Sequence, residues 1–143
     1  MRVEPSQGSG DDTALNSVEV TCMTPASSSS GTINPNTGLW GAWSAVSFCP
    51  AGQFINGVSM RVLPNQGTKP SQDDVAADAV RLLCTDNTTV LETPNAVGFG
   101  TWSAAVRCPA STAVCGFRVR FQPNQNSGDD TAFNDIELQC CAI

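Results

Sequence analysis

This chain repeats one sequence unit three times. The best preserved part of the unit is a word, Gly-Asp-Asp-Thr-Ala-x-Asn, that starts at Gly10 and again at Gly128 and has a cysteine ten residues after its second aspartate. A weaker copy in the middle of the chain keeps this spacing from Asp74 to Cys84. A fixed period of this kind indicates a supersecondary unit that is copied and packed against itself, so the fold must be built from three equivalent parts.

The repeat extends well upstream of this word. An Arg-x-x-Pro-x-Gln segment precedes every copy and places Pro5, Pro64 and Pro123 at equal steps of 59 residues. Further upstream, a Gly-x-Trp segment precedes a Cys-Pro pair, at 41–50 and again at 100–109. We assign one domain, 1–143, made of three units at 1–33, 34–92 and 93–143.

The first unit starts in the middle of the repeat. It lacks the Gly-x-Trp and Cys-Pro parts, and its opening residues have neither the basic start nor the apolar run of a secretory signal. We therefore expect an open sheet edge beside Arg2 to Pro5, which either further residues of the protein or a strand from a neighbouring chain would fill.

The cysteines indicate disulfides. Seven cysteines occur without any histidine, and their spacing does not fit the usual zinc sites. We expect Cys49 to bond Cys84, and we expect Cys22 to be unpaired or to have its partner upstream of Met1. The third unit should hold two more bridges, in an order that the sequence leaves open, among Cys108, Cys115, Cys140 and Cys141. Disulfides at this density place a protein outside the cytosol.

Composition and periodicity set the fold class. Charged residues make up 14% of the chain, the net charge is -6, and no apolar run is long enough to cross a membrane. Seven basic residues without a cluster argue against a nucleic-acid partner. Apolar and polar residues alternate at 18–22, 117–121 and 136–140, which predicts half-buried strands. We therefore expect an all-β fold of short antiparallel strands.

Taken together, these words and the terminal pair Cys140-Cys141 resemble the vitelline membrane outer layer protein I family over essentially the whole chain. The resemblance implies a β-prism, in which three four-stranded Greek-key sheets surround a pseudo-threefold axis, as in jacalin-type lectins. This chain departs from the family in the missing first half of unit one and in an insertion, Thr68 to Pro70, in unit two. The founding member belongs to the outer layer of the bird egg envelope, and the family has been linked to the formation of chito-oligosaccharides.

The paired aspartates are the candidate glycan contacts: Asp11, Asp12, Asp73, Asp74, Asp129 and Asp130. Two carboxylates can supply an acid and a base for sugar chemistry, but adjacent residues on a strand point to opposite sides. Short polar side chains also bond nearby amides in tight turns, so a structural role is favoured over sugar contact, and both over catalysis. The absence of histidine and tyrosine excludes a Ser-His-Asp triad or a tyrosine nucleophile. Calcium is a weak alternative because the spacing is unlike an EF-hand, and we expect no cofactor and no metal.

Other recurring residues have structural interpretations. Trp43 and Trp102 recur at one position of the unit and are expected in the core, whereas Trp40 has no counterpart and is expected to be partly exposed. The recurring arginines, at Arg2, Arg61 and Arg120, are expected to share one role, such as an ion pair with aspartates of the same unit. Asn87 starts the single Asn-x-Thr sequon and is a candidate N-glycosylation site.

These observations favour a secreted, disulfide-stabilised coat or matrix protein with weak glycan binding. The alternatives are a glycan-active enzyme of the chito-oligosaccharide transferase kind and a lectin-like module of an extracellular assembly. The expected partners are extracellular glycans or glycoproteins, further copies of the chain or a larger extracellular assembly, without nucleic acid or membrane insertion.

Overall fold

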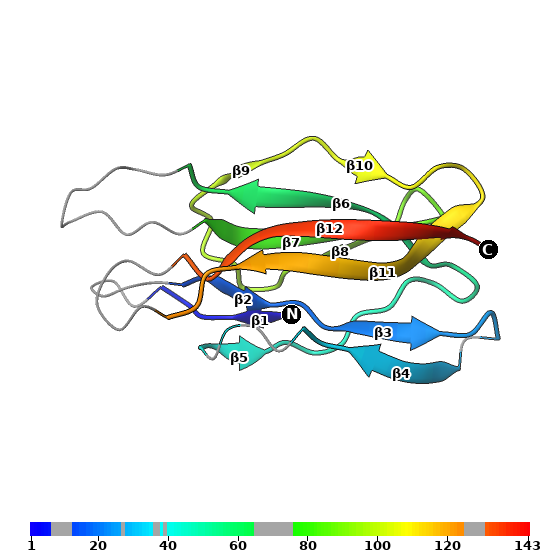
Figure 1. Cartoon of the computed structure of the whole chain (residues 1–143), viewed down its shortest axis with the longest axis horizontal. Coiled ribbons are helices and arrows are strands. Elements are labelled where there is room, and N and C mark those ends of the chain that lie inside the picture. The colour runs from blue at the N-terminus through cyan, green and yellow to red at the C-terminus, as the bar shows by residue number, and fades with distance from the viewer. Residues whose placement is uncertain (7–12, 27, 36–37, 39, 65–75, 125–130) are drawn as a thin grey trace.

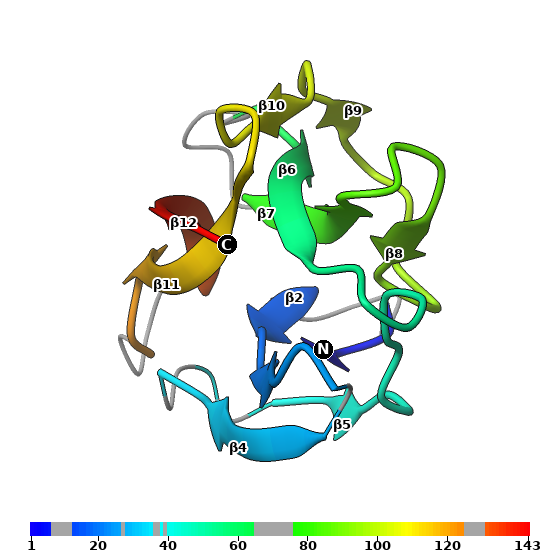
Figure 2. The same cartoon turned by 90° about the vertical axis from the view of Figure 1, so that its right-hand side faces the viewer.

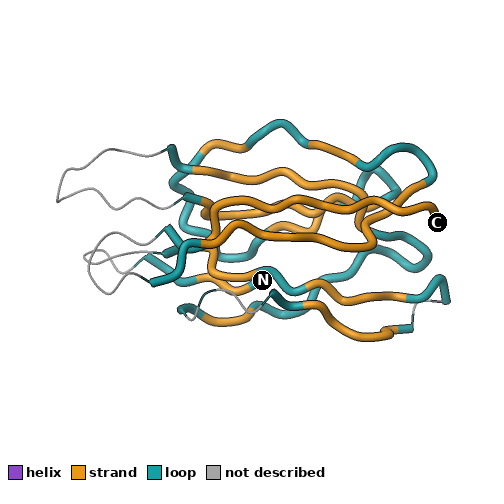
Figure 3. The backbone as a smooth tube through the Cα atoms, viewed as in Figure 1, coloured by secondary structure: helices purple, strands orange, loops and turns teal. Residues whose placement is uncertain are grey.

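The computed structural model describes residues 1–6, 13–26, 28–35, 38, 40–64, 76–124 and 131–143. Its strands are β1 (Arg2–Val3), β2 (Leu15–Ser17), β3 (Val20–Met23), β4 (Ser29–Ile33), β5 (Ala42–Trp43), β6 (Ile55–Val62), β7 (Ala77–Cys84), β8 (Val90–Glu92), β9 (Thr101–Trp102), β10 (Val106–Arg107), β11 (Thr112–Phe121) and β12 (Phe133–Ala142). The described residues form strands, turns and loops and no helix (Figure 3). The predicted all-β class is confirmed.

Each unit contributes an antiparallel pair in which the Arg-x-x-Pro strand lies beside the strand that leads to the cysteine. The pairs are β1 with β2, β6 with β7 and β11 with β12. Met60 opposes Val80 in unit two, and Val119 opposes Ile136 at the corresponding place in unit three. Seen end-on, the three pairs surround one centre (Figure 2).

The Gly-x-Trp strand of one unit completes the sheet of the unit before it. β5, from unit two, pairs with β1 of unit one, with Trp43 opposite Arg2. β9, from unit three, pairs with β6 of unit two, with Trp102 opposite Arg61, and β10 extends along the same strand. β1 therefore lies between β2 and β5, and the open edge predicted beside Arg2 is wrong at β1 because a strand of the next unit covers it.

The sheets differ in how many strands they have. β7 also pairs with β8, which gives the second unit a sheet of five strands, and β3 pairs with β4 in unit one. In unit three, β11 and β12 pair only with each other among the described strands.

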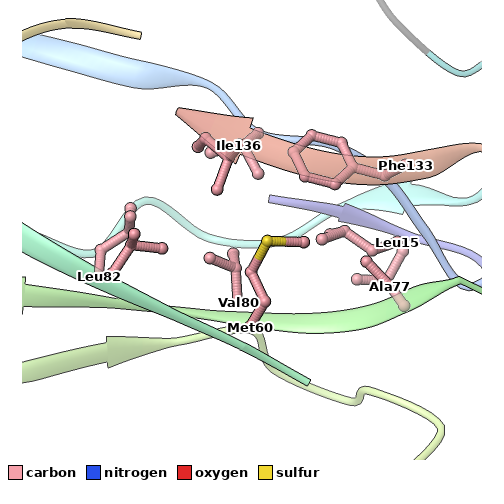
Figure 4. Packing of buried hydrophobic residues seen from close by; sticks show 10 residues of the cluster. Leu15, Met60, Ala77, Val80, Leu82, Phe133 and Ile136 are labelled. Atoms are coloured by element: carbon pink, nitrogen blue, oxygen red, sulfur yellow. The ribbon is translucent and has the colours of Figure 1, made fainter. Parts of the chain in front are cut away.

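An apolar core fills the centre between the three pairs (Figure 4). Leu15, Val80 and Phe133, one from each unit, are fully buried, and Met60 and Ile136 pack with them. Alternation along the strands directs these side chains inward. Burial of each such side chain contributes about 1.5–3 kcal/mol, so the core holds the three units together.

Three disulfides tie the cysteine strands to preceding segments. Cys49 bonds Cys84 as expected, and the structure sets the order that the sequence left open: Cys108 bonds Cys140, and Cys115 bonds Cys141. The bridged Cα atoms lie 5.7–5.8 Å apart. Cys22 is a free, half-buried thiol.

Candidate functional site

The candidate glycan contacts lie outside the described residues: Asp11, Asp12, Asp73, Asp74, Asp129 and Asp130. The strands that flank them are described. β1 and β2, β6 and β7, and β11 and β12 all present these flanking ends at one end of the molecule, at the left of Figure 1. The three copies of the word are thus connected to the same end.

In unit one, the described part of the word is a buried, hydrogen-bonded turn. The Asn16 amide donates to the Thr13 hydroxyl at 2.7 Å and to the Ala14 carbonyl at 3.3 Å. The Thr13 hydroxyl in turn donates to the Glu4 carboxylate at 2.6 Å. Ala14 has a φ of 49°, in the left-handed region that side chains rarely adopt, so the turn needs these bonds to hold it.

Unit three repeats this turn. The Asn134 amide donates to the Thr131 hydroxyl at 2.9 Å and to the Ala132 carbonyl at 3.0 Å, and Ala132 has a φ of 48°. The Thr131 hydroxyl donates to the side-chain oxygen of Gln122. The threonine, alanine and asparagine of the word therefore have a structural role in both units, while the role of the paired aspartates stays a prediction.

Unit two has an aspartate at the position of this asparagine, and the aspartate forms a buried ion pair. Asp78 occupies the position of Asn16 and Asn134, and its side chain is 0% exposed. It accepts a bond from Arg61 Nε at 2.6 Å and bonds from the backbone amides of Gly98 and Phe99 at 2.8 and 2.7 Å. A buried carboxylate requires such partners, and here they come from β6 of unit two and from the first residues of unit three.

Trp102 lies against two arginines beside this ion pair. The guanidinium carbons of Arg61 and Arg81 lie 5.3 and 3.8 Å from its ring centroid, within the range of cation–π contacts. Arg81 also bonds Glu92 at 2.7 Å. The ring of Trp102 thus connects β9 to β6 and β7. Trp102 is half-buried, so it is less buried than the core residue that the repeat predicted.

The prediction that Trp43 is buried is wrong, because 45% of this residue is exposed. Unit one has Glu19 at the position that corresponds to Arg81, and a carboxylate does not attract the face of a ring. Trp40 is 49% exposed, in agreement with its expected exposure.

The recurring arginines differ in the contacts that the described residues show. Arg2 donates to the carbonyls of Gly38 and Gly41, both at 3.1 Å, whereas Arg61 pairs with Asp78 as described. The Arg120 guanidinium lies 3.8 Å from the carboxylate of Asp135, and its side chain is 78% exposed. The expected ion pair with an aspartate of the same unit forms in units two and three, at aspartates outside the Asp-Asp pairs, while the aspartates of unit one lie outside the described residues.

A groove of about 1240 Å³ is lined by residues of all three units, and no sequence motif predicted it. Its walls are β3, the segment 43–55 and the start of β11 at 113–117. Val46 and Phe48 line it and are 62% and 53% exposed, and the free thiol of Cys22 lies in its wall. Exposed apolar side chains of this kind mark binding surfaces.

The sequon lies in an exposed turn after β7. Asn87 is exposed, with a φ of 61°. The adjacent Asp86 carboxylate accepts bonds from the Thr89 hydroxyl at 2.6 Å and from the amides of Thr89 and Thr88 at 2.9 and 3.1 Å. The Thr89 hydroxyl is the main reason why the pKa of Asp86 is lowered to about 2. Glycosylation of Asn87 stays a prediction.

The part of the chain that the structure describes contains no group of three histidine, cysteine or acidic residues arranged to hold a metal ion. It also contains no helix with the length and apolar character needed to cross a bilayer.

These features define a class: an all-β protein of three related units, cross-linked by disulfides. The family model of Vitelline membrane outer layer protein I (VOMI) matches residues 1–143, and the chain belongs to this family. It is 35% identical to the human Vitelline membrane outer layer protein 1 homolog over 99% of this chain and 68% of the human protein. It is 36% identical to the mouse homolog over 73% of this chain and 53% of the mouse protein. The relatives and the disulfides point to an extracellular location.

Sequence reasoning missed the residues that join units two and three. Asp78 carried a signal, because it is an acidic residue where the other units have asparagine. Arg81 carried none, because its contact with Trp102 depends on strand pairing between units.

Proposed function

We propose that this protein is a rigid, secreted structural component of an extracellular coat or matrix. The observation that carries the proposal is the set of three disulfides within a chain of the VOMI family, whose human and mouse relatives are named for an outer layer of the vitelline membrane. Cross-links between distant parts of the chain suit a protein that must persist outside the cell, where disulfides are stable.

The proposed architecture is a β-prism of three Greek-key sheets. The three related strand pairs around one centre support it, as does the completion of the first and second sheets by strands of the following unit. A prism exposes the connections at its ends, and the three acidic words are connected to one end.

We place weak glycan binding at this end, with the paired aspartates as the contacts. The support is the convergence of the flanking strands and the polar turns that follow the aspartates in units one and three. Glycan-array binding should fall when Asp129 and Asp130 are both changed to alanine. Asp135→Ala is the matched control, because Asp135 lies on β12 in the same unit, outside the word.

The array also separates the alternatives. Equal glycan binding by the wild type and the Asp129→Ala/Asp130→Ala variant would contradict the assignment of these aspartates as contacts. Turnover of chito-oligosaccharides by the wild type would show that the protein is an enzyme and not a structural component. Immunolocalisation in the source tissue tests the coat itself, since a protein found only inside cells contradicts the proposal.

The proposed rigidity can be tested at the disulfide between Cys49 and Cys84. Removal of the bond between Cys49 and Cys84 by a double alanine substitution opens a loop with a sequence separation of 35. The chain-entropy model gives a loss of about 3–4 kcal/mol in the free energy of unfolding. Cys22→Ala is the control, because its thiol is free. Urea denaturation measures both variants, and equal stabilities would show that the cross-link does not rigidify the fold.

A further inference from the structure

The turn between β7 and β8 contains an acceptor sequence for N-linked glycosylation, Asn87-Thr88-Thr89. Threonine stands two positions after the asparagine, and the residue between them is not proline, as the acceptor sequence requires. The turn follows directly on Cys84, which is bonded to Cys49. The structure therefore shows how this sequence is presented in the folded chain and what holds it there.

The fold holds Asn87 at the surface. Asn87 and Thr88 are both exposed. The amide of Asn87 donates to the Cys84 carbonyl at 3.1 Å, and the amide of Cys84 donates to the Thr89 carbonyl at 3.0 Å, so the backbone closes into a turn. Asn87 has a φ of 61°, which asparagine adopts more readily than most residues with side chains. A bulky, solvated glycan on Asn87 would thus meet water and not the core.

The turn lies at the end of the molecule that is opposite to the acidic words. β7 begins at the end to which these words are connected and finishes eight residues later at Cys84, at the other end (Figure 1). A glycan on Asn87 therefore does not cover the end where we place the glycan contacts, and the two sites do not compete for one surface.

The folded turn occupies the hydroxyl on which the acceptor sequence depends. The Thr89 hydroxyl donates to the Asp86 carboxylate at 2.6 Å, and the amides of Thr89 and Thr88 donate to the same carboxylate at 2.9 and 3.1 Å. Because the acceptor sequence requires a hydroxyl at this position, the transferring enzyme has to contact it. In the folded protein, that contact would replace a bond to a charged group, which is stronger than a bond between neutral groups.

The neighbouring disulfide opposes the opening of this turn. The backbone amide and carbonyl of Cys84 both bond residues of the turn, and its sulfur is bonded to Cys49, at a sequence separation of 35. Once this bridge has formed, one end of the turn is fixed to the fold, and the acceptor sequence becomes extended only by local unfolding. The enzyme therefore has better access to Asn87 before the bridge forms than after it.

We propose that Asn87 carries an N-linked glycan in the secreted protein, and that this glycan is attached before the bond between Cys49 and Cys84 forms. In the transfer, Nδ2 of Asn87 forms a bond to the anomeric carbon of an oligosaccharide on a lipid pyrophosphate and loses one proton. The bond between that carbon and the pyrophosphate oxygen breaks, and its electron pair leaves with the lipid pyrophosphate. The proposal rests on the secretion in the proposed function, and on neither the coat nor the glycan binding.

The full chain, expressed behind a cleavable secretory signal in insect cells, tests the site. The intact mass of the secreted protein should include a glycan that peptide N-glycosidase removes. Asn87→Asp should carry no glycan, whereas Thr88→Ala is the matched control and should keep it, because the acceptor sequence remains. A secreted wild type that has its disulfides but no glycan, or a glycan on the Asn87→Asp chain, overturns the proposal. Because the signal is supplied, this result is independent of the proposed function, which immunolocalisation tests separately.

The order of the two events is measured in vitro with oligosaccharyltransferase and a lipid-linked oligosaccharide. One sample is the unglycosylated chain with its disulfides formed, and the other is the same chain after reduction and alkylation. The disulfide-bonded chain should be glycosylated more slowly, by about tenfold or more, because the hydrogen bonds of the turn have to open first. An unrelated acceptor peptide, added to both samples, controls for the activity of the enzyme. Equal rates, or a faster reaction of the disulfide-bonded chain, contradict the order of attachment.

Discussion

Replacement of Asp78 by alanine is expected to lower the free energy of unfolding by about 3–5 kcal/mol. The carboxylate is 0% exposed and accepts three bonds, from Arg61 Nε and from the amides of Gly98 and Phe99. The alanine variant leaves the largely buried Arg61 guanidinium and two amides without their acceptor. An uncompensated buried charge dominates this loss, because a neutral hydrogen bond contributes only about 0.5–1.5 kcal/mol.

Unit three supplies the matched control. Asp135 faces Arg120 at 3.8 Å, with side chains 54% and 78% exposed, so Asp135→Ala should cost less than about 1 kcal/mol. Asp78→Asn should fall between the two variants, because the amide oxygen still accepts bonds while the charge is lost.

Urea denaturation under non-reducing conditions, followed by tryptophan fluorescence, measures all three variants. The reasoning requires the order Asp78→Ala, Asp78→Asn, Asp135→Ala, from most to least destabilised, with similar m values. Equal midpoints for Asp78→Ala and Asp135→Ala at unchanged m would refute the claim that burial makes the Asp78 pair strong.

Two further predictions concern the tryptophans and the turn after β7. Trp102→Ala should destabilise the fold by about 2–4 kcal/mol, more than Trp43→Ala, because only Trp102 contacts two arginines; equal losses in urea denaturation would remove the cation–π explanation. Thr89→Val should raise the pKa of Asp86 from about 2 toward its ordinary value of 3.8, as measured by an NMR pH titration. A pKa that is lowered in the folded state stabilises the protein above the ordinary pKa, and this stabilisation is lost as pH falls through about 2. Thr89→Val should therefore lower the free energy of unfolding at neutral pH but not at the acid extreme.

The repeat predicted which segments are equivalent, and the structure follows it closely. The steps between Pro5, Pro64 and Pro123 align β6 with β11, and the cysteine spacing aligns β7 with β12. The alternation of apolar residues predicted the strands because a half-buried strand needs it. These features depend on local sequence.

The arrangement between units could not be predicted in the same way. Trp102 is half-buried against arginines of another unit, whereas Trp43, with Glu19 at the position that corresponds to Arg81, is 45% exposed. The cover on β1 comes from β5, about forty residues downstream in the chain. Such contacts depend on long-range register, which a single sequence does not encode as a local pattern.

The borrowing of strands between units has a consequence for the growing chain. β6 is synthesised well before β9 and β10, so one edge of the second sheet stays unpaired until the start of the third unit has been made. Pairing between segments far apart in the sequence slows folding and leaves aggregation-prone intermediates. The units are therefore not modules that can be excised or rearranged: a cut ahead of β9 would remove the last unit and unravel the one before it.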